Sequence, residues 1–141
     1  MLTLAIDCAT QTVSLALLDE SDIRAEIDLN PGRHHAETLL PAAERLLATA
    51  GADPRDLDLL ACTVGPGSFT GLRIGLSTLK GMALALGKPV VGVSTLEALA
   101  QNVMPTERLA CPMLDARRDQ VYASLYRTGP EGYPEPGGKE A

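Results

Sequence analysis

Aromatic residues are scarce in this chain of 141 residues: Trp is absent, and Phe, Tyr and Trp together make up 3% of the sequence. The core must therefore be aliphatic, which is feasible because 45% of the residues are hydrophobic and only 21% are charged. Basic residues are also in short supply, since 12 Lys and Arg stand against 18 Asp and Glu and give a formal net charge of −6. A protein that grips nucleic acid through its own surface needs a basic footprint. We therefore expect any RNA to be bound through a partner.

Cysteines are few and widely spaced. Cys8, Cys62 and Cys111 form no C-x-x-C motif, so free thiols in a reducing cytosol are the simplest interpretation. The apolar N-terminus lacks the basic residues of a signal peptide and is interrupted by Asp7, and no apolar run is long enough to span a membrane. These absences predict a cytoplasmic protein without membrane contact.

Apolar residues alternate with other residues in three runs near the N-terminus, at positions 2–6, 13–17 and 23–29. Period-2 patterning of this kind predicts an antiparallel meander of three strands. Helical spacing follows over residues 34–50 and ends at Gly51, a residue typical of helix C-termini. The sequence thus begins as an α/β protein.

The remaining elements are predicted from shorter patterns. We expect a strand over 57–64, the loop GPGSFTG, a helix over 70–86, a buried strand over 90–93, a helix from Ser94 or Thr95 to Val103, and strands over 109–126 around a polar turn. The last 13 residues contain four Gly and three Pro and are predicted to be a flexible tail.

One internal similarity bears on domain organisation. A shift of 108 residues places residues 4–7 over 112–115 and residues 13–18 over 121–126, so that in both copies a strand ends in Asp and a second strand follows a short turn. The chain is accordingly predicted to contain a first domain over residues 1–107, the opening hairpin of a second over 108–128, and a tail over 129–141.

Asp7 and Asp115 each end a strand beside a tight turn. Actin-like and sugar-kinase-like ATPases place a carboxylate near metal-bound phosphates in this way. Such turns favour Gly, whereas Ala9 occupies the place here. The alternative interpretation is a solvent-facing turn in which the Asp only forms hydrogen bonds.

The loop over residues 65–73 joins a strand to a helix and contains Gly65, Gly67 and Gly71. The N-terminus of the following helix offers free N–H groups to an anion. The loop is not a Walker motif, because Leu72 and Arg73 follow where Lys and Ser or Thr would be required. A turn that is merely capped by Ser68 or Thr70 is the alternative.

His34 and His35 do not have the spacing of a helical zinc site, which would need a second His four residues further along the helix. Adjacent helical side chains point about 100° apart, so one metal ion cannot easily take both. We interpret His34 with Glu37 as residues of a helix start and predict no metal site.

The helix predicted over 70–86 is apolar on two sides. One side suits a sheet and carries Leu72, Leu76, Leu79, Ala83 and Leu86; the other is formed by small or adaptable residues, namely Gly71, Gly75, Thr78, Met82 and Ala85. A helix of this kind must be covered on both sides. Either the first helix of the same chain or a partner protein covers the second side.

Five segments in order resemble the bacterial TsaB (YeaZ) family: LAIDCAT at 4–10, RHHAETLLP at 33–41, GPGSFTGLRIG at 65–75, GVSTLEALA at 92–100 and LDARRDQVY at 114–122. The resemblance implies an actin-like, ribonuclease H-like (ASKHA) half with a mixed five-stranded sheet and helices, followed by the first hairpin of a second half. Members usually continue through a complete second half, whereas this chain stops soon after that hairpin.

The resemblance also implies a function. It indicates a non-catalytic subunit of the apparatus that makes threonylcarbamoyladenosine beside the anticodon of tRNA, without a cofactor of its own. The expected partners are a TsaD-type catalytic subunit and a TsaE-type ATPase, with a homodimer when the protein is alone and tRNA reached only through the complex. A nucleotide-binding phosphotransferase and a glycoprotease-like metallopeptidase are the alternatives.

Particular residues follow from the resemblance. The family uses its first two helices for partner contact, which here implies an interface of Thr38, Ala42, Arg45, Gly71, Ile74, Gly75, Thr78 and Met82. A vestigial nucleotide site would comprise Asp7, Thr10, Gly65, Gly67 and Asp115. No residue is assigned to catalysis or to metal binding.

Overall fold

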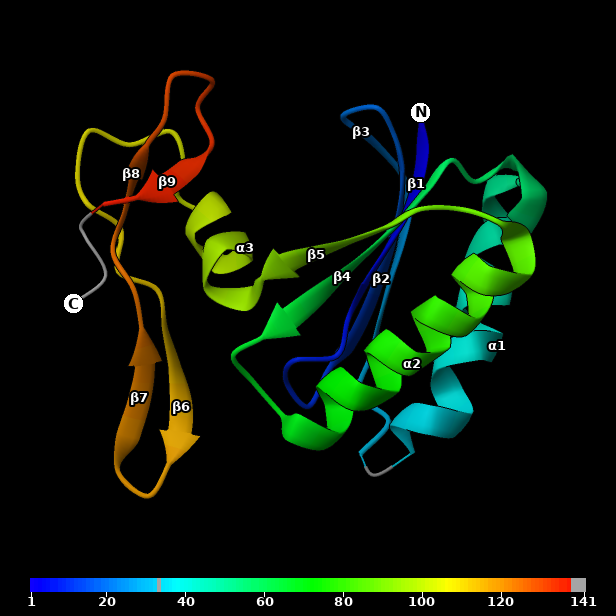
Figure 1. The fold of residues 1–141 in the computed structure, drawn as a ribbon, viewed down its shortest axis with the longest axis horizontal. Coiled ribbons are helices and arrows are strands. Elements are labelled where there is room, and N and C mark those ends of the chain that lie inside the picture. The colour runs from blue at the N-terminus through cyan, green and yellow to red at the C-terminus, as the bar shows by residue number, and fades with distance from the viewer. Residues whose placement is uncertain (33, 138–141) are drawn as a thin grey trace.

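A mixed five-stranded sheet forms the centre of the computed structural model, which describes residues 1–32 and 34–137 (Figure 1). Its strands are β1 (Leu2–Asp7), β2 (Val13–Asp19), β3 (Asp22–Leu29), β4 (Leu59–Gly65) and β5 (Val90–Ser94), in the order β3-β2-β1-β4-β5. The first three strands are antiparallel, and β1 pairs in parallel with β4, which pairs in parallel with β5. The predicted meander and the α/β class are confirmed.

Three α-helices accompany the sheet: α1 (His35–Ala50), α2 (Phe69–Leu86) and α3 (Thr95–Gln101). A single 3-10 turn, η1 (Pro54–Asp56), precedes β4. Gly51 and Gly87 end α1 and α2 in the left-handed conformation, each with φ of 66°, as the C-cap signal predicts. α3 is shorter than predicted, because the chain turns after Gln101 through hydrogen bonds from Val103 and Met104 back to the helix. None of the described helices is long and apolar enough to cross a membrane.

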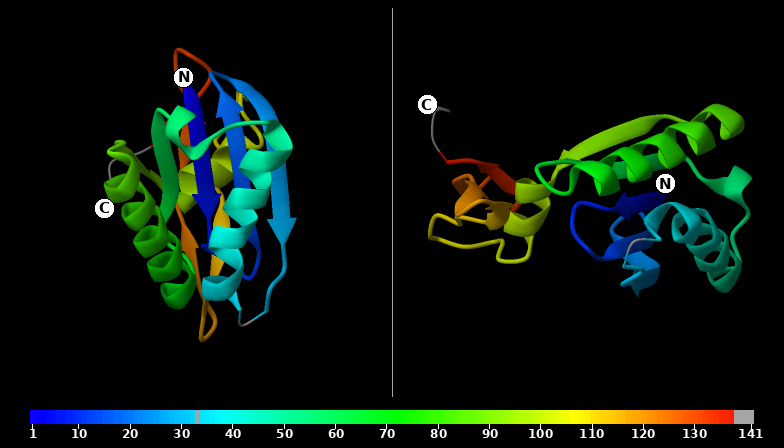
Figure 2. Two further views of the ribbon diagram at one scale, coloured as in Figure 1. Left: turned by 90° about the vertical axis from the view of Figure 1, so that its right-hand side faces the viewer. Right: turned by 90° about the horizontal axis from the view of Figure 1, so that it is seen from below.

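The two long helices lie side by side on one face of the sheet, and α3 lies on the other (Figures 1 and 2). α1 packs on β2 and β3, while α2 packs on β4 and β1. Because side chains alternate along a strand, every second residue faces these helices. The fully buried side chains of this layer are mostly leucines, including Leu4, Leu15, Leu17, Leu39, Leu46, Leu60 and Leu79. The core is thus aliphatic, as the composition requires.

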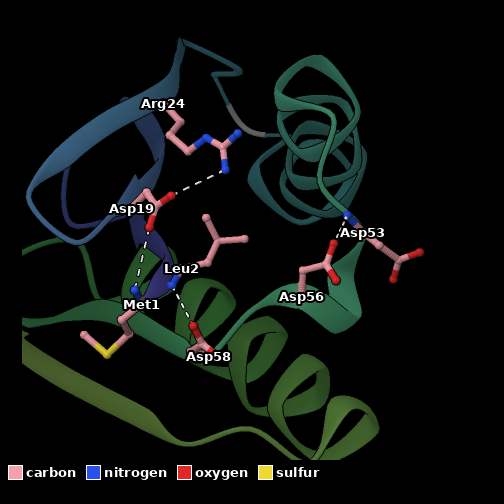
Figure 3. Close-up of polar contacts among 7 residues, drawn as sticks. All are labelled: Met1, Leu2, Asp19, Arg24, Asp53, Asp56 and Asp58. Atoms are coloured by element: carbon pink, nitrogen blue, oxygen red, sulfur yellow. Dashed lines mark hydrogen bonds and ion pairs between the residues drawn. The ribbon is translucent and has the colours of Figure 1, made fainter.

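Polar contacts fix the N-terminal end of β1 to the approach of β4 (Figure 3). The Leu2 amide donates to Asp58 Oδ2 at 2.8 Å, which joins positions 56 residues apart. Asp19 accepts ion pairs from the Met1 ammonium and from Arg24, each at 3.6 Å. These contacts hold the register in which β1 becomes the middle strand.

The C-terminal part forms two small sheets of its own. β6 (Met113–Arg117) pairs with β7 (Gln120–Ala123), as the polar turn predicts, and β8 (Tyr126–Thr128) pairs with β9 (Pro134–Pro136). Tyr126 packs with Leu96 and Ala100 of α3 in a second, smaller core. That β6 and β7 begin a second domain stays a prediction.

The prediction of a flexible tail is wrong for its described part, residues 129–137. β9 pairs with β8, and the Gly137 amide donates to the Leu125 carbonyl at 2.7 Å. The glycines and prolines that suggest disorder instead serve a hairpin: Gly132 turns the chain with φ of 82°, and prolines are tolerated in β9 because an edge strand needs few donors. Residues 138–141 of the predicted tail lie outside the described residues.

Candidate functional site

The glycine-rich loop between β4 and α2 lies directly against the turn between β1 and β2. The Ser68 amide donates to the Ala9 carbonyl at 2.6 Å. A Cβ at Gly67 would lie 2.4 Å from the same carbonyl oxygen, so only glycine fits there. The loop and the turn are therefore packed against each other and joined by a backbone hydrogen bond.

Ser68 is the N-cap of α2, as one alternative predicts. Its Oγ accepts a hydrogen bond from the Gly71 amide at 3.2 Å, and its carbonyl accepts one from Leu72. The side-chain cap thereby satisfies the Gly71 amide, one of the four N–H groups at this helix end that lack an intrahelical partner. The cap therefore reduces the number of free backbone N–H groups with which the start of α2 could bind an anion.

Asp7 forms internal hydrogen bonds. Its Oδ1 accepts from the Ala9 amide at 3.0 Å and from the Thr63 hydroxyl. The carboxylate therefore closes its own turn and ties β1 to β4, as in the second interpretation of this motif, although the side chain is half-buried rather than facing solvent.

A cleft of about 840 Å³ lies between the start of α2 and the β6–β7 hairpin. Thr10, Gly67 and Asp115 line it together, as expected for the vestigial nucleotide site. Asp7 and Gly65 are not among its lining residues. Asp7 instead lines a groove on the sheet, and Gly65 has a φ of 115° at the end of β4. Three of the five predicted residues are brought together.

Two aromatic residues in this cleft were not among the predicted site residues. Phe69 is 73% exposed, and the Arg73 guanidinium lies 5.0 Å from the centre of its ring. Tyr122, which is 43% exposed, comes from the hairpin. Aromatic residues make up only 3% of the chain, and this scarcity is the sequence signal that could have singled them out.

The predicted partner interface is only partly accessible. On α1, Arg45 is exposed and Thr38 half-buried; on α2, Ile74, Thr78 and Met82 are half-buried. We call these five residues the α1–α2 surface. Ala42 is 5% exposed and belongs to the core.

The expectation that Gly71 and Gly75 lie on the partner surface is wrong. A Cβ at Gly71 would lie 2.2 Å from the Cys8 carbonyl oxygen, and one at Gly75 would lie 3.2 Å from the Cys8 side chain. The end of β1 passes under α2 at this point, and the two glycines allow the close approach. At these two positions α2 packs against Cys8, the residue that follows β1.

Two of the three cysteines, Cys8 and Cys62, are free thiols buried in this core. Burial raises the pKa of Cys8 to about 12, with further contributions from the nearby Asp7 and Cys62. Burial also raises the pKa of Cys62, and Lys80 opposes the shift. Neither thiol is suited to act as a nucleophile.

His34 and Glu37 pair at the start of α1, with 3.4 Å between Nδ1 and the carboxylate. This confirms their interpretation as residues of a helix start. Within residues 1–32 and 34–137, no group of three or more His, Cys, Asp or Glu is placed to hold a metal ion.

Comparisons with known proteins find one matching family and several similar proteins. The family model described as "TsaD: tRNA N6-adenosine threonylcarbamoyltransferase" matches residues 23–134. The chain is 40% identical over 127 residues to "tRNA threonylcarbamoyladenosine biosynthesis protein TsaB" of Bacillus subtilis, which covers 90% of this chain and 56% of that protein. The Escherichia coli protein of the same name is 40% identical over 136 residues, or 94% of this chain and 58% of its own length. The chain thus spans little more than half of these relatives.

Solved structures of other proteins show the same fold. "YeaZ from Pseudomonas aeruginosa" superimposes with a TM-score of 0.89 at 37% identity, covering 99% of this chain and 66% of the other. A ROK hexokinase of Thermus thermophilus matches with a TM-score of 0.51 at 17% identity, covering 89% of this chain and 46% of the enzyme, and shows the fold alone. The fold is actin-like.

Proposed function

We propose that this chain, which belongs to the TsaD family and resembles its members named TsaB or YeaZ, acts in tRNA threonylcarbamoyladenosine biosynthesis. In this proposal it is a non-catalytic subunit that binds a TsaD-type partner. The extent of the matches carries this proposal. Relatives named TsaB in Bacillus subtilis and Escherichia coli match 90–94% of the chain, whereas relatives named as the transferase match 69–75%.

The α1–α2 surface is the proposed contact with that partner. It combines apolar groups of Ile74 and Met82 with the exposed charge of Arg45 on two helices that lie side by side. Exposed apolar patches on rigid elements are typical of protein interfaces.

The expectation for tRNA follows from the charge of the chain. With a net charge of −6, the protein is poorly suited to hold tRNA directly, so we expect tRNA to be bound by the assembled complex. A TsaE-type ATPase would join the same complex.

Titration calorimetry with a purified TsaD-type subunit tests the proposal. Thr78→Arg places a long charged side chain on the α1–α2 surface and should weaken binding at least tenfold, about 1.4 kcal/mol. Gln101→Arg adds the same charge at an exposed position at the end of α3, on the other side of the sheet, and should bind like the parent chain.

Circular dichroism on each variant shows whether it is folded. Equal affinity of folded Thr78→Arg and the parent chain would remove the α1–α2 surface from the proposal. Failure of the parent chain to bind would remove the TsaD-type partner itself.

A nucleotide-binding phosphotransferase is a second candidate, favoured by the gathering of Thr10, Gly67 and Asp115 around one cleft. Against it, Asp7 is engaged by Ala9 and Thr63, and Ser68 occupies the Gly71 amide. Calorimetry with ATP and Mg²⁺ decides: we expect no binding heat, and a saturable signal lost in Asp115→Asn would support this candidate instead.

A further inference from the structure

We draw no further inference here: the strongest candidate, the cleft between the start of α2 and the β6–β7 hairpin with Phe69, Arg117 and Tyr122 in its walls, belongs to the site already described.

Discussion

At Gly71 the structure has room for a hydrogen atom and nothing larger. The oxygen that a new Cβ would meet belongs to the backbone of Cys8 and cannot rotate away. We expect Gly71→Ala to lower the free energy of unfolding by about 1–3 kcal/mol, the usual cost of overpacking. Urea denaturation of the parent and variant chains measures the difference.

Gly81 of the same helix is the matched control. Nothing lies within 4 Å of a Cβ at this position, and the residue is exposed. Gly81→Ala should therefore raise the free energy of unfolding by about 0.5–1 kcal/mol through helix propensity. Similar effects of both substitutions would contradict the packing assigned to Gly71.

Cys8 is expected to make the free energy of unfolding depend on pH in the alkaline range. The pKa of its thiol is about 12 in the folded chain against an ordinary value of 9.0, because burial and the neighbouring Asp7 disfavour the thiolate. Below pH 9 the thiol is protonated in both states, so its contribution to stability is fully present. Between pH 9 and 12 only the unfolded chain loses the proton, and the contribution falls as pH rises.

Urea midpoints at pH 8 and pH 10.5 test this reasoning. The parent chain should lose more stability over this interval than Cys8→Ala, while Cys111→Ala, which changes an exposed thiol, should behave like the parent. An identical pH slope in the parent and in Cys8→Ala would rule out Cys8 as the source.

Among the elements, the β6–β7 hairpin is the one with the least support. It forms a sheet of only two strands, and Met113 and Val121 are 61% and 62% exposed. Two-stranded hairpins are marginally stable by themselves. Amides of the hairpin should exchange with deuterium at least on the order of tenfold faster than those of β1 and β4. Uniform protection across both regions would show that the hairpin folds with the main sheet.

The elements also show where sequence patterns suffice. Alternation predicts β1 to β3 well because one face of each strand is buried, and the glycines at positions 51 and 87 end α1 and α2 as expected. The order of residues 129–137 was missed because Gly and Pro are equally common in tight hairpins and in disordered segments. Only the pairing partner, β8, distinguishes the two.

For the candidate site, the sequence does not indicate which neighbours a residue faces in the folded chain. The motif GPGSFTG predicts a tight loop and a capped helix, and both are present. It does not say that Gly71 and Gly75 face Cys8, because small residues look the same in sequence whether they meet a partner or their own chain. Likewise Asp7 could bind phosphate or its own turn, and only the positions of Ala9 and Thr63 decide.

For the whole molecule, the α1–α2 surface predicts self-association when no partner is present. An apolar face on two parallel-lying helices can be buried against its own copy through a two-fold axis. Light scattering at high concentration should give twice the chain mass of 14.8 kDa for the parent and for Gln101→Arg, and the chain mass for Thr78→Arg. A parent chain that stays monomeric at all concentrations would contradict the prediction.

The place of β1 in the middle of the sheet has a consequence for synthesis on the ribosome. β2 and β3 follow β1 closely and pair with it and with each other, but β4, its other neighbour, ends only at Gly65. At translation rates of roughly 5–20 residues per second, the second edge of β1 stays unpaired for a few seconds after β3 has emerged. In that interval a neighbouring nascent chain can pair with it, so the yield of folded protein should depend on how quickly β4 follows.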